Sequence, residues 1–199
     1  RFLELLDQYA ILHDAGDKLN GIDAEDTFDG RSLAPHAGAI QMVLGSTGSK
    51  TLLDYGCGKA EGYENFPIQL PDGSQVNGFG QMWGNPEITL YDPGYEKYSA
   101  LPTGKFDCVI CTDVLEHIPA EDLDWVIEEI FGFSQKVIFC TVALYPAKKV
   151  LPNGDNAHIT LESPGWWLNK FEAISRARGG QKFYLIAMRT AQDMMFIES

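Results

Sequence analysis

The sequence contains little positive charge. Lys and Arg number 15 against 28 Asp and Glu, so the formal net charge at neutral pH is −13. Proteins that bind nucleic acid generally need a basic surface to release counterions from phosphates. Here the only basic clusters are the short segments 148–149 and 176–178. We therefore expect nucleic acid not to be the main partner.

Long apolar runs and informative cysteine spacings are also missing. No apolar stretch approaches the roughly 18 residues of a membrane span, and Glu4 and Asp7 interrupt the first apolar segment, unlike a secretion signal. Cys108 and Cys111 resemble half of a zinc site, but no second pair completes it. All four cysteines fall in or beside predicted strands. We expect free thiols, no membrane partner and a cytoplasmic location.

The sequence does contain a regular succession of strand and helix patterns. Its length of 199 residues and its 45% hydrophobic content suit one α/β domain. The apolar patterns predict strands at 52–55, 88–91, 106–112, 136–142, 183–188 and 194–197, and helices at 2–14, 32–44, 114–118, 121–130 and 165–176. Residues 190–193 predict the turn of an antiparallel hairpin. The predicted fold is α/β: a Rossmann-like, mostly parallel sheet with a C-terminal antiparallel hairpin and helices on both faces.

Two parts of the chain stand apart from this succession. Residues 1–31 consist of one amphipathic helix and an acidic, glycine-punctuated loop, which we interpret as a cap. Residues 32–199 form the main domain, with an insertion at about 61–86 in which no period is recognisable. Within the insertion, the segment 71–73 (PDG) predicts the turn of a small hairpin.

A glycine-rich turn follows the first predicted strand of the main domain. Gly56 and Gly58 remove side chains that would block a ligand from the backbone, and they permit unusual backbone angles. The next strand ends at Asp92. Nucleotide-binding α/β sheets place an acid at such a strand tip to hold ribose hydroxyls. This pattern predicts a nucleotide-type ligand.

Three segments resemble motifs of one enzyme family. The segment 52–58 (LLDYGCG), Asp92 and the segment 106–118 (FDCVICTDVLEHI) resemble the first, second and fourth motifs of class I S-adenosylmethionine-dependent methyltransferases. The resemblance covers residues 32–199 and includes the terminal hairpin. Ala60 stands where that family usually has a third glycine, and the segment after Asp92 is unusually short.

The resemblance implies S-adenosyl-L-methionine as the cofactor. It places the methionine part near Asp54, Gly56 and Gly58 and the ribose at Asp92, and Leu101 is expected near the adenine from its position. The expected cofactor-binding residues are Asp54, Gly56, Cys57, Gly58, Asp92, Pro93, Leu101, Thr112 and Asp113.

A cluster of acids and histidines predicts the catalytic chemistry. If 113–118 begins a helix, then Asp113, Glu116 and His117 share one face, and His158 emerges at the same sheet edge after the following strand. Such oxygen and nitrogen ligands suit Mg²⁺, Mn²⁺ or Fe²⁺. The set resembles the metal site of small-RNA 3′-end methyltransferases and ubiquinone-pathway O-methyltransferases, with Asp113 replacing a Glu. Without a metal, His158 is either a general base or a structural residue, and His117 shapes the cofactor pocket.

The resulting expectation is a methyltransferase that acts on oxygen of a small polyhydroxylated or sugar-linked acceptor, with or without a divalent metal. His158 and His117 are the candidate catalytic residues. The alternatives are an RNA 2′-O-methyltransferase, which the acidic charge disfavours, and a non-enzymatic S-adenosylmethionine-binding subunit. A dinucleotide oxidoreductase is a further alternative, but Glu61 occupies the place of the last glycine in its Gly-x-Gly-x-x-Gly motif.

Overall fold

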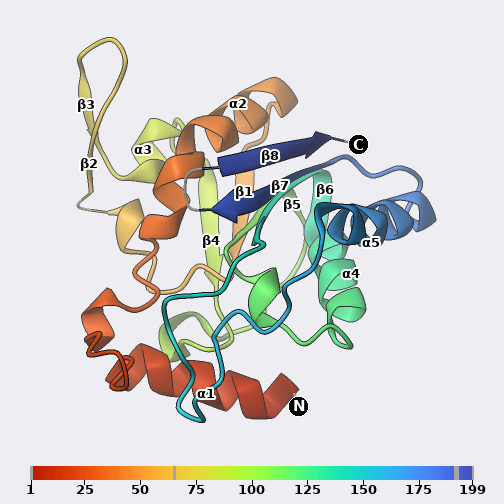
Figure 1. Cartoon of the computed structure of the whole chain (residues 1–199). Helices are drawn as coiled ribbons and strands as arrows, with labels where there is room; N and C mark the ends of the chain where they lie inside the picture. Colours follow the sequence, from red (N-terminus) through yellow and green to blue (C-terminus); the bar gives the residue numbers. More distant parts are fainter. Residues whose placement is uncertain (1, 65, 191–192, 199) are drawn as a thin grey trace.

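The computed structural model describes residues 2–64, 66–190 and 193–198 (Figure 1). The helices are α1 (Phe2–Ala15), α2 (Ala37–Thr47), α3 (Phe79–Met82), α4 (Leu123–Phe133) and α5 (Pro164–Ala177). The strands are β1 (Thr51–Tyr55), β2 (Pro67–Gln69), β3 (Gln75–Asn77), β4 (Glu87–Tyr91), β5 (Phe106–Thr112), β6 (Ser134–Ala143), β7 (Phe183–Thr190) and β8 (Asp193–Glu198).

Six of these strands form one sheet in the order β4-β1-β5-β6-β7-β8. All neighbouring pairs are parallel except β7 and β8, which are antiparallel. The predicted fold class is therefore confirmed. From β1 the chain first moves to one side, to β4, and then to the other side, to β5. The carboxyl ends of β1 and β5 thus flank the point where the direction reverses, which is where open α/β sheets bind ligands.

Helices cover both faces of the sheet. Alternate residues of β5 explain how, because Cys108 and Ile110 face one apolar cluster while Val109 and Cys111 face the other. A strand buried on both faces must be apolar, which is why residues 108–111 of β5 form a continuous apolar run. One cluster contains side chains of α2 and α3, and the other contains side chains of α4 and α5. Among them are Ile40, Val43, Phe79 and Trp83 on the first face, and Ile127, Phe131, Trp167 and Phe171 on the second.

Helix α1 covers neither face of the sheet, although its first residue, Phe2, packs against the cluster that α4 and α5 cover. In Figure 1 it runs along the bottom of the molecule, beside the loop that connects β6 to α5. The hydroxyl of Tyr9 in α1 donates to the carbonyl oxygen of Ala157 in that loop, at 2.8 Å. Residues of α1 also line a cavity at the carboxyl ends of the sheet strands.

The insertion at 61–86 contains the predicted hairpin and one unpredicted helix. Strands β2 and β3 pair antiparallel, with Ile68 opposite Val76, and the hairpin projects from the body at the upper left of Figure 1. The short helix α3 follows. Its Phe79 stacks on Trp83 with ring centroids 5.5 Å apart, and both rings are buried against the sheet. Trp83 is therefore a core residue, and so is Trp167 of α5, which is fully buried.

The helix predicted at 114–118 is wrong. Asp113 has a backbone φ of 60°, in the left-handed region, and its N–H donates to Thr141 Oγ1 at 3.0 Å. Val114 is also outside the helical region, and only one 3-10 turn, Leu115–His117, follows. Because the left-handed residue breaks the helical period at once, Asp113 and Glu116 do not share a face.

The structure also bears on the cysteines and on membrane spans. All four cysteines are buried and free. Each lies in a strand or in the glycine turn, where a thiol behaves as a small apolar side chain. Among the described helices, none is both long enough and apolar enough to pass through a bilayer.

Candidate functional site

A cavity of about 260 Å³ lies at the carboxyl ends of β1, β4 and β5. Most of the residues predicted to bind the cofactor line it: Gly56, Cys57, Gly58, Asp92, Pro93, Thr112 and Asp113. Asp54 instead lines a smaller cavity of about 20 Å³, which shares Gly56, Cys57 and Thr112 with the first. Leu101 lines neither cavity and is 55% exposed, so the structure does not bring it to the site.

The glycine turn is required by the packing of the protein itself. Gly56 and Gly58 have φ values of 84° and 57°. A Cβ on Gly56 would lie 2.3 Å from Cγ2 of Val114, and a Cβ on Gly58 would lie 2.2 Å from the carbonyl oxygen of Phe28. The sequence analysis expected the missing side chains to admit a ligand. In the structure the space is filled by Val114 and by the backbone at Phe28, so this part of the interpretation is corrected.

Asp92 is fixed by two backbone hydrogen bonds. Its Oδ2 accepts from the Gly58 nitrogen at 2.8 Å, and its Oδ1 accepts from the Gly94 nitrogen at 2.9 Å. Burial raises the pKa of Asp92, and the two backbone bonds oppose that shift. Each carboxylate oxygen still has a lone pair, so the group can accept further hydrogen bonds from a ligand in the cavity.

His13 of α1 lies next to Asp92. Its Nε2 is 3.9 Å from Asp92 Oδ1, and its ring stacks on Tyr95 with centroids 5.1 Å apart. Burial, and then the nearby Lys59 and Lys149, lower the pKa of His13 to about 4. The imidazole is therefore neutral at neutral pH, and the carboxylate of Asp92 remains available to a ligand.

Asp54 has one satisfied and one unsatisfied carboxylate oxygen. Oδ2 accepts from the hydroxyl of Tyr63 at 2.7 Å. Oδ1 is buried without a hydrogen-bond partner among the described residues, in the wall of the smaller cavity that Gly30 and Ser32 also line. Burial raises the pKa of Asp54 to about 7. A buried, unpartnered acceptor costs about 1–3 kcal/mol, so a ligand that donates here would stabilise the site.

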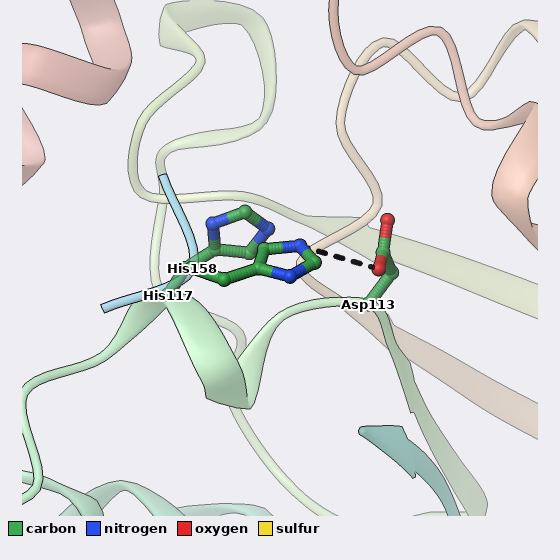
Figure 2. A group of neighbouring side chains, drawn as sticks. All are labelled: Asp113, His117 and His158. Carbon is green, nitrogen blue, oxygen red and sulfur yellow. Dashed lines mark ion pairs between the residues drawn. The ribbon is translucent and has the colours of Figure 1, made fainter. Parts of the chain in front are cut away.

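Three of the four predicted metal ligands lie close together at the carboxyl end of β5. Figure 2 shows the imidazole rings of His117 and His158 side by side, with the carboxylate of Asp113 facing them. One ligand atom of each residue lies within 4.8 Å of the others. The Nε2 atom of His158 is 3.9 Å from Oδ1 of Asp113. The geometry therefore offers two nitrogens and one oxygen to a common point.

Backbone hydrogen bonds set the tautomer of both histidines. His117 Nδ1 lies 2.8 Å from the carbonyl oxygen of Ala157, and His158 Nδ1 lies 2.6 Å from that of Tyr145. Because a carbonyl oxygen only accepts, each Nδ1 carries the proton and each Nε2 has a free lone pair when the ring is neutral. This arrangement orients imidazoles that bind metals in proteins.

Burial keeps His117 in that neutral form. It lowers the pKa of His117 to about 4, although the negative charge of Asp113 opposes the shift. Asp113 adopts its left-handed backbone at this same point. Non-glycine residues in that conformation are strained by about 1 kcal/mol or more, and such strain is concentrated at functional sites.

Glu116 does not join the cluster. Its side chain is buried, its Oε1 accepts from the Ala143 nitrogen at 2.5 Å, and its Oε2 has no partner within the described chain. Burial, and then the charge of Asp113, raise the pKa of Glu116 well above its usual value. The raised pKa opposes ionisation, and Glu116 does not line the cavity, so it is a poor ligand for a cation there.

The sequence analysis did not find several residues that line the cavity. Helix α1 contributes apolar and aromatic side chains from one face: Phe2, Leu5, Leu6, Tyr9 and His13. Their spacing predicted the helix, but periodicity does not indicate what a helix packs against. Lys149 also lines the cavity. Its only signal was membership of one of the few basic clusters.

Comparison of the chain with protein-family models, with curated proteins and with solved structures finds no match. A functional assignment therefore depends on the cavity, its charged groups and the motifs in the sequence.

Proposed function

We propose that this protein is an S-adenosyl-L-methionine-dependent methyltransferase that acts on a hydroxyl of a small polyhydroxylated or sugar-linked acceptor. The observation that carries the proposal is the cavity at the reversal point of the sheet, with Asp92 at one strand tip and the unpartnered oxygen of Asp54 beside the glycine turn. The donor carries positive charge on its sulfonium and its ammonium. Asp92 and Asp113 line the cavity, and Asp54 lines the smaller cavity that shares residues with it, so the acids complement that charge.

The two acids suit different parts of the donor. Asp92 is held by the nitrogens of Gly58 and Gly94 with lone pairs to spare, as an acceptor for two vicinal ribose hydroxyls requires. Asp54 Oδ1 needs a donor, and an ammonium group would supply one in charge-assisted form. The resemblance of 52–58 and 106–118 to the methyltransferase motifs supports the same placement.

The histidines provide the acid–base chemistry. In methyl transfer the acceptor oxygen attacks the methyl carbon, the carbon–sulfur bond breaks, and the sulfur keeps the electron pair. The hydroxyl proton must go to a base, and His158 Nε2 has a free lone pair for it. His117 lies beside it, with ring centroids 4.8 Å apart. Alignment of oxygen, carbon and sulfur supplies most of the rate enhancement.

We further propose that Asp113, His117 and His158 hold a divalent cation of the Mg²⁺, Mn²⁺ or Fe²⁺ class. Two imidazole nitrogens and one carboxylate form a three-ligand set that leaves coordination positions for an acceptor. Such a cation lowers the pKa of a hydroxyl that it binds. If no cation binds, His158 acts directly as the base, with Asp113 close enough to stabilise its protonated form.

Calorimetry tests the cofactor. We expect S-adenosylhomocysteine to bind with a dissociation constant in the micromolar range, about −8 kcal/mol, and NAD not to bind. Binding of NAD but not of S-adenosylhomocysteine would replace the proposal with the oxidoreductase alternative.

A tritium-transfer screen of sugars, catechols and short RNA, with and without chelator, tests the reaction and the metal. We expect transfer to a small hydroxyl compound that chelator abolishes and Mn²⁺ restores. His158→Ala should lose turnover and keep its affinity for S-adenosylhomocysteine, whereas Glu162→Ala, at an exposed position after the same loop, should keep both. Unchanged turnover in chelator excludes the metal, and absence of any transfer favours a non-enzymatic binding subunit.

RNA 2′-O-methylation is the less supported alternative. The net charge of −13 opposes binding of a polyanion, and the described cavity has few cationic groups to offset it. We propose the cytoplasm as the location, because the four buried, free thiols suit a reducing compartment.

A further inference from the structure

Lys149 places a positive charge in an otherwise acidic cavity. Its side chain lines the cavity, and its Nζ lies 4.6 Å from the centroid of the Phe28 ring. Within the described chain, this Nζ makes no ion pair or hydrogen bond with another residue. Burial lowers the pKa of Lys149, and the more distant charges of Asp113 and Asp29 only partly oppose that shift. A cation in this situation lacks a close counterion.

The backbone holds Lys149 next to the histidine cluster. The Lys149 carbonyl accepts from the Ala157 nitrogen at 3.1 Å, and the next residue, Val150, pairs with Asn156. Val150 is anchored in turn to Asp17, whose Oδ2 accepts from its nitrogen at 2.9 Å. The carbonyl of the same Ala157 accepts from His117 Nδ1. These hydrogen bonds hold Lys149 and the residue before His158 next to each other in one loop.

Lys149 interacts electrostatically with groups on both sides of the cavity. Asp113 and His117 belong to the histidine cluster, whereas His13 lies beside Asp92. The hydrogen bond from the Ala157 nitrogen to the Lys149 carbonyl places the residue beside the histidine cluster. Because interactions between charges are screened beyond about 8 Å at physiological ionic strength, a cation at this point attracts a small anion although the net charge of the chain is negative.

We infer that Lys149 binds an acidic group of the methyl acceptor, so that the acceptor is a hydroxy compound that also carries a carboxylate or a phosphate. This inference rests on the proposed function. An acidic group would give the half-buried ammonium the counterion that the protein does not supply. It would also hold the hydroxyl beside His158, since the two side chains come from one loop.

The test uses pairs of probes that differ only in an acidic group: 3,4-dihydroxybenzoate with catechol, and glucuronate with glucose. Calorimetry is performed on protein saturated with S-adenosylhomocysteine. We expect the acidic member of a pair to bind wild type about tenfold more tightly or better. Lys149→Met should abolish that preference, and Lys149→Arg should retain most of it. Lys148→Met, at the exposed neighbouring position, is the matched control and should behave as wild type.

Three results would overturn the inference. Wild type could show no preference for the acidic probes, or Lys149→Met could keep the preference. Alternatively, Lys149→Met could weaken S-adenosylhomocysteine but not 5′-methylthioadenosine, which lacks the carboxylate; Lys149 would then bind the donor. Failure of the proposed function is distinguishable, because wild type would not bind S-adenosylhomocysteine. The probe preference, measured without it, would then still decide whether Lys149 binds anions.

Discussion

The carboxylate of Asp92, at the tip of β4, accepts a 2.8 Å hydrogen bond from the backbone nitrogen of Gly58, in the turn after β1. This bond joins two segments that the sequence analysis treated as separate parts of a nucleotide site. It fixes their relative position without a ligand. The site is therefore largely preformed, and binding does not require these two segments to be ordered at further cost.

Asp92→Asn tests this bond. An amide offers one acceptor oxygen, so it cannot accept from both Gly58 and Gly94, and its NH₂ group would face a backbone N–H. We expect a loss of about 1–3 kcal/mol in the free energy of unfolding in urea, and affinity for S-adenosylhomocysteine at least about tenfold weaker by calorimetry. Asp124→Asn, in an exposed surface ion pair, is the control and should change little. Wild-type affinity in the Asp92 variant would contradict the ribose assignment.

A second substitution should restore stability to an alanine variant of Gly56 but not to an alanine variant of Gly58. Gly56→Ala places a methyl group against the side chain of Val114, whereas Gly58→Ala places one against the carbonyl of Phe28. Both variants should be destabilised, each also paying about 1 kcal/mol for the left-handed backbone. Adding Val114→Ala should restore part of the stability of Gly56→Ala in thermal unfolding. Phe28→Ala should not restore Gly58→Ala, because the clash is with backbone. If both second substitutions restored stability equally, then Gly58 would face the side chain of Phe28 and not its carbonyl oxygen, which would contradict the prediction.

The raised pKa of Asp54 predicts a pH-dependent stability. The carboxyl titrates near 3.8 when unfolded and at about 7 when folded, so the folded state binds more protons between these values. Stability contributed by this group is therefore highest at low pH and falls as pH rises from about 4 to 7. Asn cannot ionise, so Asp54→Asn should gain stability over wild type at about pH 8 but not at about pH 4. Thermal unfolding across that range measures it, and a pH-independent difference would contradict the shift.

The same carboxyl links donor affinity to pH in the opposite direction. An ammonium group binds the ionised form of Asp54, so affinity for S-adenosylhomocysteine should rise with pH and level off above about 7, with at most about tenfold per pH unit. Asp54→Asn should bind more weakly, and its affinity should lose this dependence. 5′-Methylthioadenosine, which lacks the ammonium, serves as the control ligand. A wild-type affinity that is flat between about pH 5 and 8 would exclude Asp54 as its partner.

Glu116→Gln tests whether Glu116 binds the metal, as the sequence predicts, or whether Asp113, His117 and His158 bind it without Glu116. Glu116 is buried, and Gln can present the same carbonyl oxygen to the Ala143 nitrogen. We expect near-wild-type stability and unchanged Mn²⁺ affinity by calorimetry. Asp113→Asn should lose about tenfold or more in Mn²⁺ affinity. If Glu116→Gln loses the metal as strongly as Asp113→Asn does, then Glu116 is a ligand.

The strands were predictable because burial on both faces leaves a strong trace in sequence. The mostly apolar segment 106–112 is followed by Asp113 and preceded by Lys105, and β5 has the predicted bounds. Helix α3 was missed because its four residues are too few to show a helical period, and its aromatic residues are scattered among glycines. Short elements are held by tertiary packing, here by Phe79 and Trp83, and not by a local pattern.

The candidate site was predictable as a place but not as an arrangement. Acids and histidines at the carboxyl ends of neighbouring strands must lie at one edge, so Asp113 and His158 meet as expected. The left-handed backbone of Asp113 could not be predicted from the residue type, because aspartate is enriched in that conformation but adopts other conformations far more often. Because the chain changes direction at Asp113, the side chain of Glu116 points into the core. Lys149 entered the site through the folding of a long loop, which periodicity does not describe.

The hydroxyl of Tyr9 lies 2.8 Å from the carbonyl oxygen of Ala157 and 3.1 Å from that of His117. The Ala157 oxygen therefore serves the first helix and the His117 imidazole together. If α1 detached from the loop, the Ala157 carbonyl would lose its hydrogen bond from Tyr9. A ligand that fixes His117 would also fix this carbonyl, and it would therefore make detachment of α1 less favourable. Occupancy of the site should thus slow amide hydrogen exchange along the whole of α1 (Phe2–Ala15), including the turns that do not touch a ligand.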